Sequence, residues 1–203
     1  MQETSIDVIA SALEGAAGAQ LGDFSSPDGA VTLLFCELAN IEAIRATIPE
    51  RVDALLADQR MIVLRIASHH NGEIARAHED GYMIVFNSAH AGLRCAIELQ
   101  RTFAQAPVGE ARTQLELRVG LHTGPVIDTG QELYGRNVLL GARVAGKAQG
   151  GEIVISAKVK EYTESDPSFC FTERGEHHFK GLHGEHELFA VSWEAVTPSQ
   201  EQA

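Results

Sequence analysis

Two acidic residues sit where packing does not explain them. Glu37 lies near the end of the apolar run VTLLFCEL, and a carboxylate at the end of a buried strand has no packing role. Asp80 lies in HEDGY, between the strand-like runs EIARAH and YMIVF. If these runs form a hairpin beside the first strand, the two carboxylates converge and can hold a divalent cation together with substrate phosphates. The alternative for Asp80 is a turn residue, since Asp-Gly is the usual sequence of a tight hairpin turn.

Two basic residues form a second candidate group. Gly135 precedes a helical stretch that carries Arg143 about two turns in, and Lys180 is followed by a glycine later in the chain. Arginine and lysine side chains that reach a common cleft would clamp a phosphate group. Taken singly, Arg143 also fits a solvated helix residue, and Lys180 a turn residue.

The elements that must position these groups follow from periodicity. A buried strand over 31–38 precedes a long amphipathic helix over 41–66, which Pro49 interrupts near its start and which ends near Asn71-Gly72. The hairpin, a helix over 88–106 and the strand LELRVGLHTGPVI come next. This β-α-β-β-α-β order predicts an α+β fold with a ferredoxin-like core, and we expect its helices on one face of the sheet.

The rest of the chain extends this core. A helix over 136–149, the strand EIVIS and a short helix around Val159 lead to two strands, SFCFTERGEHHF and HELFAVSW. At the other end, Ile6, Ile9 and Leu13 predict a helix over 5–17, before a linker rich in Gly, Ser and Pro. We therefore expect a helix and linker over 1–29, a globular domain over 30–193 and a disordered tail over 194–203.

Composition narrows the class of protein. The 203 residues carry a net charge of −12, with 44% hydrophobic and 22% charged residues, as in a globular domain. So acidic a chain disfavours nucleic acid and anionic membranes as partners. No apolar run reaches the about 20 residues of a membrane helix, and MQETSIDVIA has no basic signal region, which predicts a cytoplasmic location. The three cysteines form no CxxC pair, which argues against a zinc site or a disulfide framework.

Taken in order, five motifs carry a family resemblance: VTLLFCEL, NGEIARAHEDGYMIVF, LRVGLHTGPV, ELYGRNVLLGARV and GEHHFKGL. Across Ala30 to Trp193 the chain resembles the catalytic domain of class III adenylyl and guanylyl cyclases. The resemblance implies a head-to-tail dimer with active sites at the subunit interface. There, two divalent metal ions (Mg²⁺ or Mn²⁺) promote attack of the ribose 3′-hydroxyl on the α-phosphate, with loss of pyrophosphate.

Three positions keep the residue that the family uses. The resemblance assigns the second metal acid to Asp80, stabilisation of the pentavalent phosphate to Arg143 and triphosphate binding to Lys180. The glycine that usually precedes the second metal acid is Glu79, which could be a spare metal ligand or a perturbation.

Four positions depart from the family. The first metal acid, usually Asp, is Glu37, and the base-reading Lys and its acidic partner, usually Asp, are Arg76 and Glu132. The Asn that orients the ribose is Leu139. The longer Glu37 displaces its carboxylate by about 1 Å, which Mg²⁺ tolerates badly. Leu139 cannot donate a hydrogen bond, and losing one such donor costs roughly 10² to 10³ in rate.

These assignments favour a weak adenylate cyclase. Arg76 with Glu132 keeps a cationic donor beside an acid, which suits adenine, so ATP is the preferred nucleotide. In a homodimer, Glu37 and Asp80 would come from one chain and the remaining site residues from the other. The alternative is an inactive cyclase-like module that binds nucleotide or pairs with another cyclase chain. HEDGY lacks the two glycines and second acid of the diguanylate cyclase hairpin, which argues against that third class.

Overall fold

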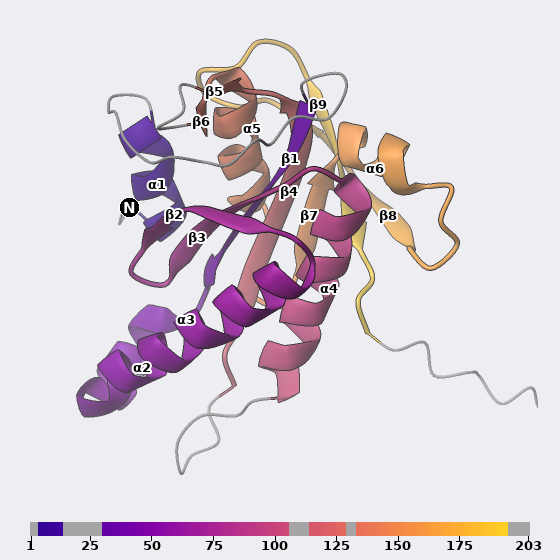
Figure 1. The fold of residues 1–203 in the computed structure, drawn as a ribbon. Helices are drawn as coiled ribbons and strands as arrows, with labels where there is room; N and C mark the ends of the chain where they lie inside the picture. The colour runs from indigo at the N-terminus through magenta and orange to yellow at the C-terminus, as the bar shows by residue number, and fades with distance from the viewer. Residues whose placement is uncertain (1–3, 14–29, 106–113, 129–132, 195–203) are drawn as a thin grey trace, which may run out of the picture.

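A twisted seven-stranded sheet forms the centre of the protein, in the order β2-β3-β1-β4-β7-β9-β8 (Figure 1). The computed structural model describes residues 4–13, 30–105, 114–128 and 133–194. The strands of the sheet are β1 (Ala30–Leu38), β2 (Glu73–His78), β3 (Gly81–Phe86), β4 (Leu117–Pro125), β7 (Ile153–Ser156), β8 (Phe171–His177) and β9 (His186–Val191). The helices are α1 (Ser5–Leu13), α2 (Ile41–Thr47), η1 (Pro49–Arg51), α3 (Val52–His69), α4 (Ala89–Gln105), α5 (Arg136–Ala145) and α6 (Ala157–Thr163).

The predicted ferredoxin-like core is confirmed. Strand β1 pairs antiparallel with β3 on one side and with β4 on the other, and β2 pairs with β3 at the edge. Beyond β4, strand β7 adds in parallel, and the β8–β9 pair completes the sheet. A short ribbon of β5 (Ile127–Asp128) and β6 (Leu133–Tyr134), which periodicity did not predict, connects β4 to α5.

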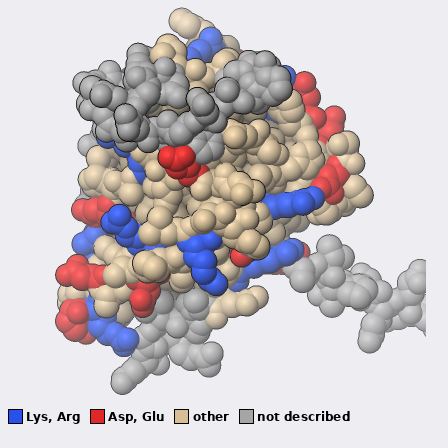
Figure 2. Space-filling model, in the orientation of Figure 1, with Lys and Arg blue, Asp and Glu red and all other residues tan. Residues whose placement is uncertain are grey.

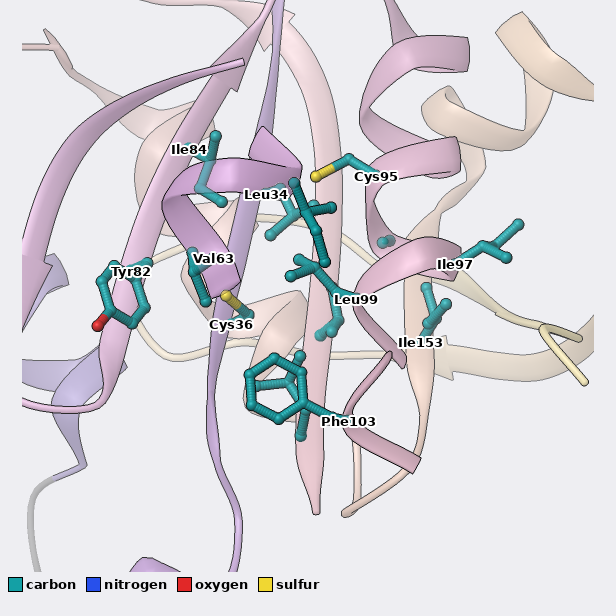
Figure 3. Close-up of a cluster of buried hydrophobic side chains, with 14 of the residues drawn as sticks. Leu34, Cys36, Val63, Tyr82, Ile84, Cys95, Ile97, Leu99, Phe103 and Ile153 are labelled. Atoms are coloured by element: carbon teal, nitrogen blue, oxygen red, sulfur yellow. The ribbon is translucent and has the colours of Figure 1, made fainter. Parts of the chain in front are cut away.

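Helices cover both faces of the sheet, so the expectation of helices on one face is wrong. On one side, Leu34 and Cys36 of β1 belong to a cluster with α3 and α4 (Figure 3). The intervening Leu33 and Phe35 belong to a second cluster, which includes side chains of α1 and α5. Because side chains alternate along a strand, the unbroken apolar run of β1 requires two covered faces.

The predicted interruptions of the chain are also present. Pro49 begins the short 3₁₀ helix η1 between α2 and α3, and Ile48 before it is non-helical, with φ of −137° and ψ of 57°. After α3, Asn71 adopts a left-handed φ of 56°, and the N–H of Gly72 donates to the carbonyl of Ala67 at 2.8 Å. This hydrogen bond is the usual C-terminal closure of a helix, and it turns the chain into β2.

The amino-terminal helix packs on the sheet. The predicted helix over 5–17 is α1 from Ser5 to Leu13, and residues 14–29 lie outside the described residues. Ile6 and Ile9 are each only 2% exposed and join the second cluster, so α1 is anchored beside β2 and β3. The expected tail lies outside the described residues from 195 onward.

Surface features bear on possible partners. On the face that Figure 2 shows, acidic and basic side chains are interspersed among other residues. Within the described ranges, no helix is both long and apolar enough to cross a bilayer.

Candidate functional site

Glu37 and Asp80 come together at one end of the sheet. Glu37 is the penultimate residue of β1, and Asp80 lies in the tight turn between β2 and β3; they are 2% and 3% exposed. The N–H of Leu38 donates to Oδ2 of Asp80 at 2.9 Å, so the Asp80 carboxylate touches the residue that follows Glu37. Gln59 of α3 donates to the Asp80 carbonyl oxygen at 2.8 Å and holds the turn from the other side. The predicted convergence of the two acids is therefore present.

Arg118 is a site residue that sequence reasoning missed. It lies on β4 directly opposite Glu37 in the β1–β4 register, and its guanidinium forms an ion pair with Oε1 of Glu37. Burial lowers the pKa of Arg118 from its ordinary value, and the charge of Asp7 acts in the opposite direction. Cross-strand pairing was the signal that could have identified Arg118, since it follows from aligning β1 with β4.

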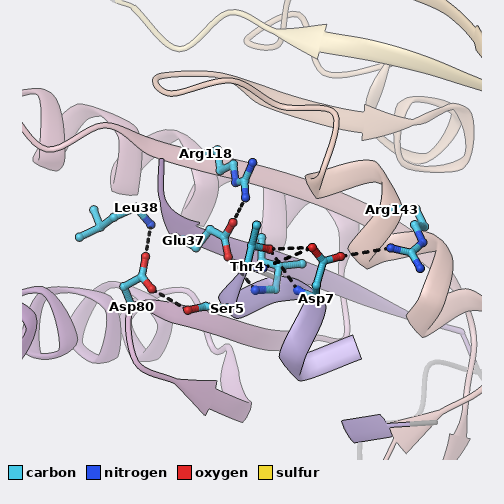
Figure 4. Close-up of polar contacts among 9 residues, drawn as sticks. Thr4, Ser5, Asp7, Glu37, Leu38, Asp80, Arg118 and Arg143 are labelled. Carbon is cyan, nitrogen blue, oxygen red and sulfur yellow. Dashed lines mark hydrogen bonds and ion pairs between the residues drawn. The ribbon is translucent and has the colours of Figure 1, made fainter. Parts of the chain in front are cut away.

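The first turn of α1 lies directly on the two acids (Figure 4). The hydroxyl of Ser5 donates to Oδ1 of Asp80 at 2.6 Å, and the backbone N–H of Ile6 donates to Oε2 of Glu37 at 2.6 Å. Thr4 caps the helix by accepting the N–H of Asp7 at 3.2 Å on its hydroxyl oxygen. The Asp7 carboxylate in turn pairs with Nη1 of Arg143 at 3.1 Å.

A cavity of about 490 Å³ opens beside these residues. Its walls come from the start of α1, the β1–α2 junction, the β2–β3 turn and β4, through Thr4, Ser5, Val8, Glu37, Leu38, Ala39, Ile41, Glu42, Arg45, His78, Glu79, Asp80 and Arg118. Glu79, in a left-handed conformation with φ of 47°, pairs with Nη2 of Arg45 at 2.7 Å. In this conformation the Glu79 carboxylate is held by α2.

The residues predicted to bind phosphate lie on α5 and on the loop between β8 and β9. Arg143 and Leu139 are half-buried on this helix, while Lys180 is exposed in the connection between β8 and β9. A Cβ placed on Gly181 would lie 3.5 Å from Cδ2 of Leu139, so the Lys180 loop runs beside that side chain. Arg136 ties the loop to α5 by donating to the carbonyl of His183 at 2.8 Å.

Of the two residues predicted to read the base, only Arg76 lies within the described part of the chain. Arg76 is half-buried on β2, where its Cα pairs with Met83 of β3. Glu132 lies outside the described residues. Whether the two side chains approach each other therefore stays a prediction.

A buried histidine fixes the start of α5. His122 of β4 is 5% exposed; its Nε2–H donates to Oδ1 of Asn137 at 3.0 Å, and its Nδ1 accepts from the hydroxyl of Ser156 at 2.8 Å. Burial lowers the pKa of His122 to about 4, against the opposing hydrogen bond to Asn137, so the ring is neutral. Asn137 also donates to the carbonyl of Pro125 at 2.5 Å. This network positions the helix that carries Arg143.

One group of side chains elsewhere has the composition of a metal site. Ligand atoms of His69, His70 and Glu98 lie within 4.8 Å of one another, and no other such group of three occurs in the part of the chain that the structure describes. One Glu98 oxygen pairs with Nδ1 of His69 at 3.2 Å and with Nε2 of His70 at 2.7 Å. Hydrogen bonds to Glu98 account for this arrangement, which joins the end of α3 to α4, and none of the three residues lines the cavity beside Glu37 and Asp80.

Comparison with known sequences identifies one family. The profile of the adenylate and guanylate cyclase catalytic domain matches residues 25–192. An uncharacterized protein of Mycobacterium tuberculosis (strain ATCC 25618 / H37Rv) is 31% identical over 161 residues, which make up 77% of this chain and 53% of the relative. A protein of Rhizobium meliloti (strain 1021) is 28% identical over 130 residues, 63% of this chain and 22% of the relative. The chain thus spans about half or less of the length of these curated relatives.

Solved structures share the fold. Adenylate cyclases from Trypanosoma brucei in their monomeric state superpose with a TM-score of 0.74 at 20% identity, covering 85% of this chain and 92% of theirs. The guanylate cyclase domain of RhGC from Catenaria anguillulae, solved with GTP, gives 0.71 at 19% identity, covering 81% and 97%. The adenylyl cyclase CyaB from P. aeruginosa gives 0.69 at 19% identity, covering 82% and 95%.

Proposed function

Because this chain belongs to the adenylate and guanylate cyclase catalytic domain family, we propose that it converts ATP to 3′,5′-cyclic AMP and pyrophosphate. The observation that carries the proposal is the pair of buried carboxylates at one end of the sheet, Glu37 near the end of β1 and Asp80 in the turn between β2 and β3. Buried carboxylates are costly unless they are paired or bind a cation, which makes such a pair a functional candidate.

The donor set suits a hard divalent cation. Glu37 and Asp80 each accept hydrogen bonds on both carboxylate oxygens, as ionised groups do. Carboxylate oxygens are the ligands that Mg²⁺ and Mn²⁺ prefer, so these two residues would hold the two metal ions of a cyclase. When bound, such ions withdraw charge from the phosphates and favour attack by the ribose 3′-hydroxyl.

The other site residues have complementary roles in the proposal. Arg143 would stabilise the charge that develops on the α-phosphate, and Lys180 would bind the outer phosphates. Arg76 and Glu132 would read the adenine ring. We propose a homodimer in which these four residues act on nucleotide held by the acids of the partner chain; pairing with another cyclase chain is the heteromeric alternative.

Two departures predict slow turnover. Glu37 is one methylene longer than aspartate and its carboxylate is paired with Arg118, which restricts how it can meet a metal ion. At Leu139 an alkyl side chain lies beside Gly181, where a ribose-orienting donor is expected. Loss of that donor corresponds to roughly 10² to 10³ in rate.

Leu139 also supports a second candidate function. A domain that retains the acids and Arg143 but lacks the ribose donor could bind nucleotide, or support a competent cyclase chain, without catalysis. Nucleotide binding in the absence of product formation would distinguish this non-enzymatic module from a slow enzyme.

A product assay tests the proposal. Purified protein is incubated with ATP or GTP and with Mn²⁺ or Mg²⁺, and cyclic nucleotide and pyrophosphate are measured, with Asp80→Asn as the inactive control. Light scattering in parallel gives the mass, and a value near 21.9 kDa at all concentrations would contradict the homodimer. We expect cyclic AMP to form, faster with Mn²⁺. Absence of product from a folded dimer under every condition would refute the catalytic function.

A further inference from the structure

Three successive residues of α1 each contact a different residue of the candidate site. The contacts are Ser5 hydroxyl to Asp80 at 2.6 Å, Ile6 N–H to Glu37 at 2.6 Å, and Asp7 carboxylate to Arg143 at 3.1 Å. Helix packing alone needs no such match, because the apolar face of α1 requires only apolar neighbours. These three polar contacts therefore indicate that the first turn of α1 fits the candidate site specifically.

The contacts of α1 are complementary in charge both to the carboxylates of Glu37 and Asp80 and to the guanidinium of Arg143. The amino-terminal end of a helix carries about half a positive charge, and here it faces two carboxylates. The side chain that faces Arg143 is instead an acid, Asp7. In the proposed homodimer, the carboxylates of this chain require a cation in one active site, and its Arg143 requires a phosphate of the nucleotide in the other. α1 thus presents a substitute for each: polar donors and a helix end for the metal, and a carboxylate for the phosphate.

α1 also occupies the atoms that a metal would need. Oε2 of Glu37 and Oδ1 of Asp80 each accept a hydrogen bond from α1. The remaining oxygens of these carboxylates accept from Arg118 and from the N–H of Leu38. A cation can bind the first pair of oxygens only after α1 has moved, since the present donors lie within hydrogen-bond distance of both.

We propose that α1 is an internal inhibitor, which competes with divalent metal for Glu37 and Asp80 and, through Asp7, with nucleotide phosphate for Arg143. One docked helix would thus block the part of each active site that its own chain supplies. The inference rests on the proposed function, because it names the regulation of that same site. Ile6 and Ile9 supply the apolar anchor for docking. A helix of nine residues is marginal by itself in water, so its stability depends on this docked state. Undocking therefore unfolds α1, which costs little helix-forming free energy, and it opens the site.

Gly81 offers a way to displace α1 without altering any charge. A Cβ at this residue would lie 2.5 Å from Cβ of Ser5 and 3.2 Å from its carbonyl carbon, while its other near neighbour, the carbonyl oxygen of His78, is at 3.4 Å. Gly81→Ala therefore pushes against the first turn of α1. Gly146→Ala is the matched control, since a Cβ there meets nothing closer than 3.6 Å.

Charge reversal gives an independent second variant. Asp7→Lys places a cation against Arg143, and Asp58→Lys makes the same change in net charge at an exposed residue of α3. In all four variants and the parent chain, Mn²⁺ binding is measured by calorimetry, with and without a non-hydrolysable ATP analogue. Hydrogen exchange over residues 4–13 reports docking. Asp7→Lys keeps the inference testable if Gly81→Ala does not fold.

We expect Gly81→Ala and Asp7→Lys to bind Mn²⁺ about tenfold more tightly than the parent, with faster exchange over residues 4–13, and both controls to match the parent. Saturating Mn²⁺ with the analogue should also raise exchange over residues 4–13 in the parent. Equal Mn²⁺ affinity in parent and variants, with product formed by all of them, would overturn the inhibitor while leaving the cyclase function intact. Absence of metal and nucleotide binding in every protein would refute the proposed function and the inference together.

Discussion

Acidification should destabilise this fold through His122. The imidazole is buried between Asn137 and Ser156, and burial lowers its pKa from 6.5 to about 4. In the unfolded chain the same ring titrates near 6.5. Between pH 6.5 and pH 4 the unfolded state therefore binds more protons than the folded state, so the free energy of unfolding falls as the pH is lowered through this range.

The size of this effect follows from the two pKa values. Moving the pKa of a histidine from 6.5 to about 4 corresponds to about 3 kcal/mol of lost stability once the pH has reached 4. Above pH 6.5 the ring is neutral in both states and contributes no pH dependence. Protonation would also break the hydrogen bond that Nδ1 accepts from Ser156, because a charged ring has no free acceptor.

Urea unfolding at a series of pH values measures the effect, with His122→Gln as the matched variant. Glutamine keeps an amide donor and acceptor but does not titrate, so the difference between the two proteins removes the contribution of every other ionisable group. We expect the parent to lose about 3 kcal/mol relative to His122→Gln between pH 7 and pH 4. Parallel pH profiles for the two proteins would refute the neutral, buried state of His122.

Three further outcomes are expected. Asp80→Asn should abolish Mn²⁺ binding in calorimetry without unfolding the domain, because Gln59 holds the turn through the backbone carbonyl; unchanged binding would make Asp80 a turn residue only. Leu139→Asn combined with Glu37→Asp should raise the initial rate of cyclic nucleotide formation, by up to about 10²-fold from the restored donor. If the dimer of this double variant binds ATP but shows no gain in rate, the roles assigned to positions 139 and 37 are wrong. Arg118→Ala should lower the free energy of unfolding by about 3 to 5 kcal/mol, since it leaves Glu37 buried without its counter-ion. Urea unfolding measures this loss, and a change below about 1 kcal/mol would show that the ion pair adds little.

The sequence predicted the order of strands and helices because the long elements carry clear periodicity. Pro49 and the Asn71-Gly72 pair marked real interruptions, since their backbone preferences act locally. The two-residue strands β5 and β6 were missed because so short a segment has no period. The covering of both faces was also missed, although the unbroken apolar run of β1 already contained that information.

The residues of the candidate site also include some that the sequence predicted and some that it did not. The positions of Glu37 and Asp80 could be predicted because the local pattern defines both, one near the end of an apolar strand and the other in a hairpin turn. Arg118 could not be assigned without the β1–β4 register, which brings residues 81 positions apart into contact. The position of α1 on the site was harder still to predict from the sequence. The spacing of Ile6 and Ile9 predicts an apolar face on a helix, but it does not tell which surface that face will cover.

The position of α1 has a thermodynamic consequence. If α1 and a divalent cation compete for the oxygens of Glu37 and Asp80, their coupling is reciprocal, so metal weakens docking by the same factor by which docking weakens metal binding. A nucleotide whose phosphates bind Arg143 would add to the same displacement, because Asp7 holds that guanidinium in the docked state. Metal and nucleotide together would then release α1 more effectively than either one alone. A further partner that binds the Ile6 and Ile9 face of the undocked helix would shift the same equilibrium toward the open site, without contacting any residue that binds substrate.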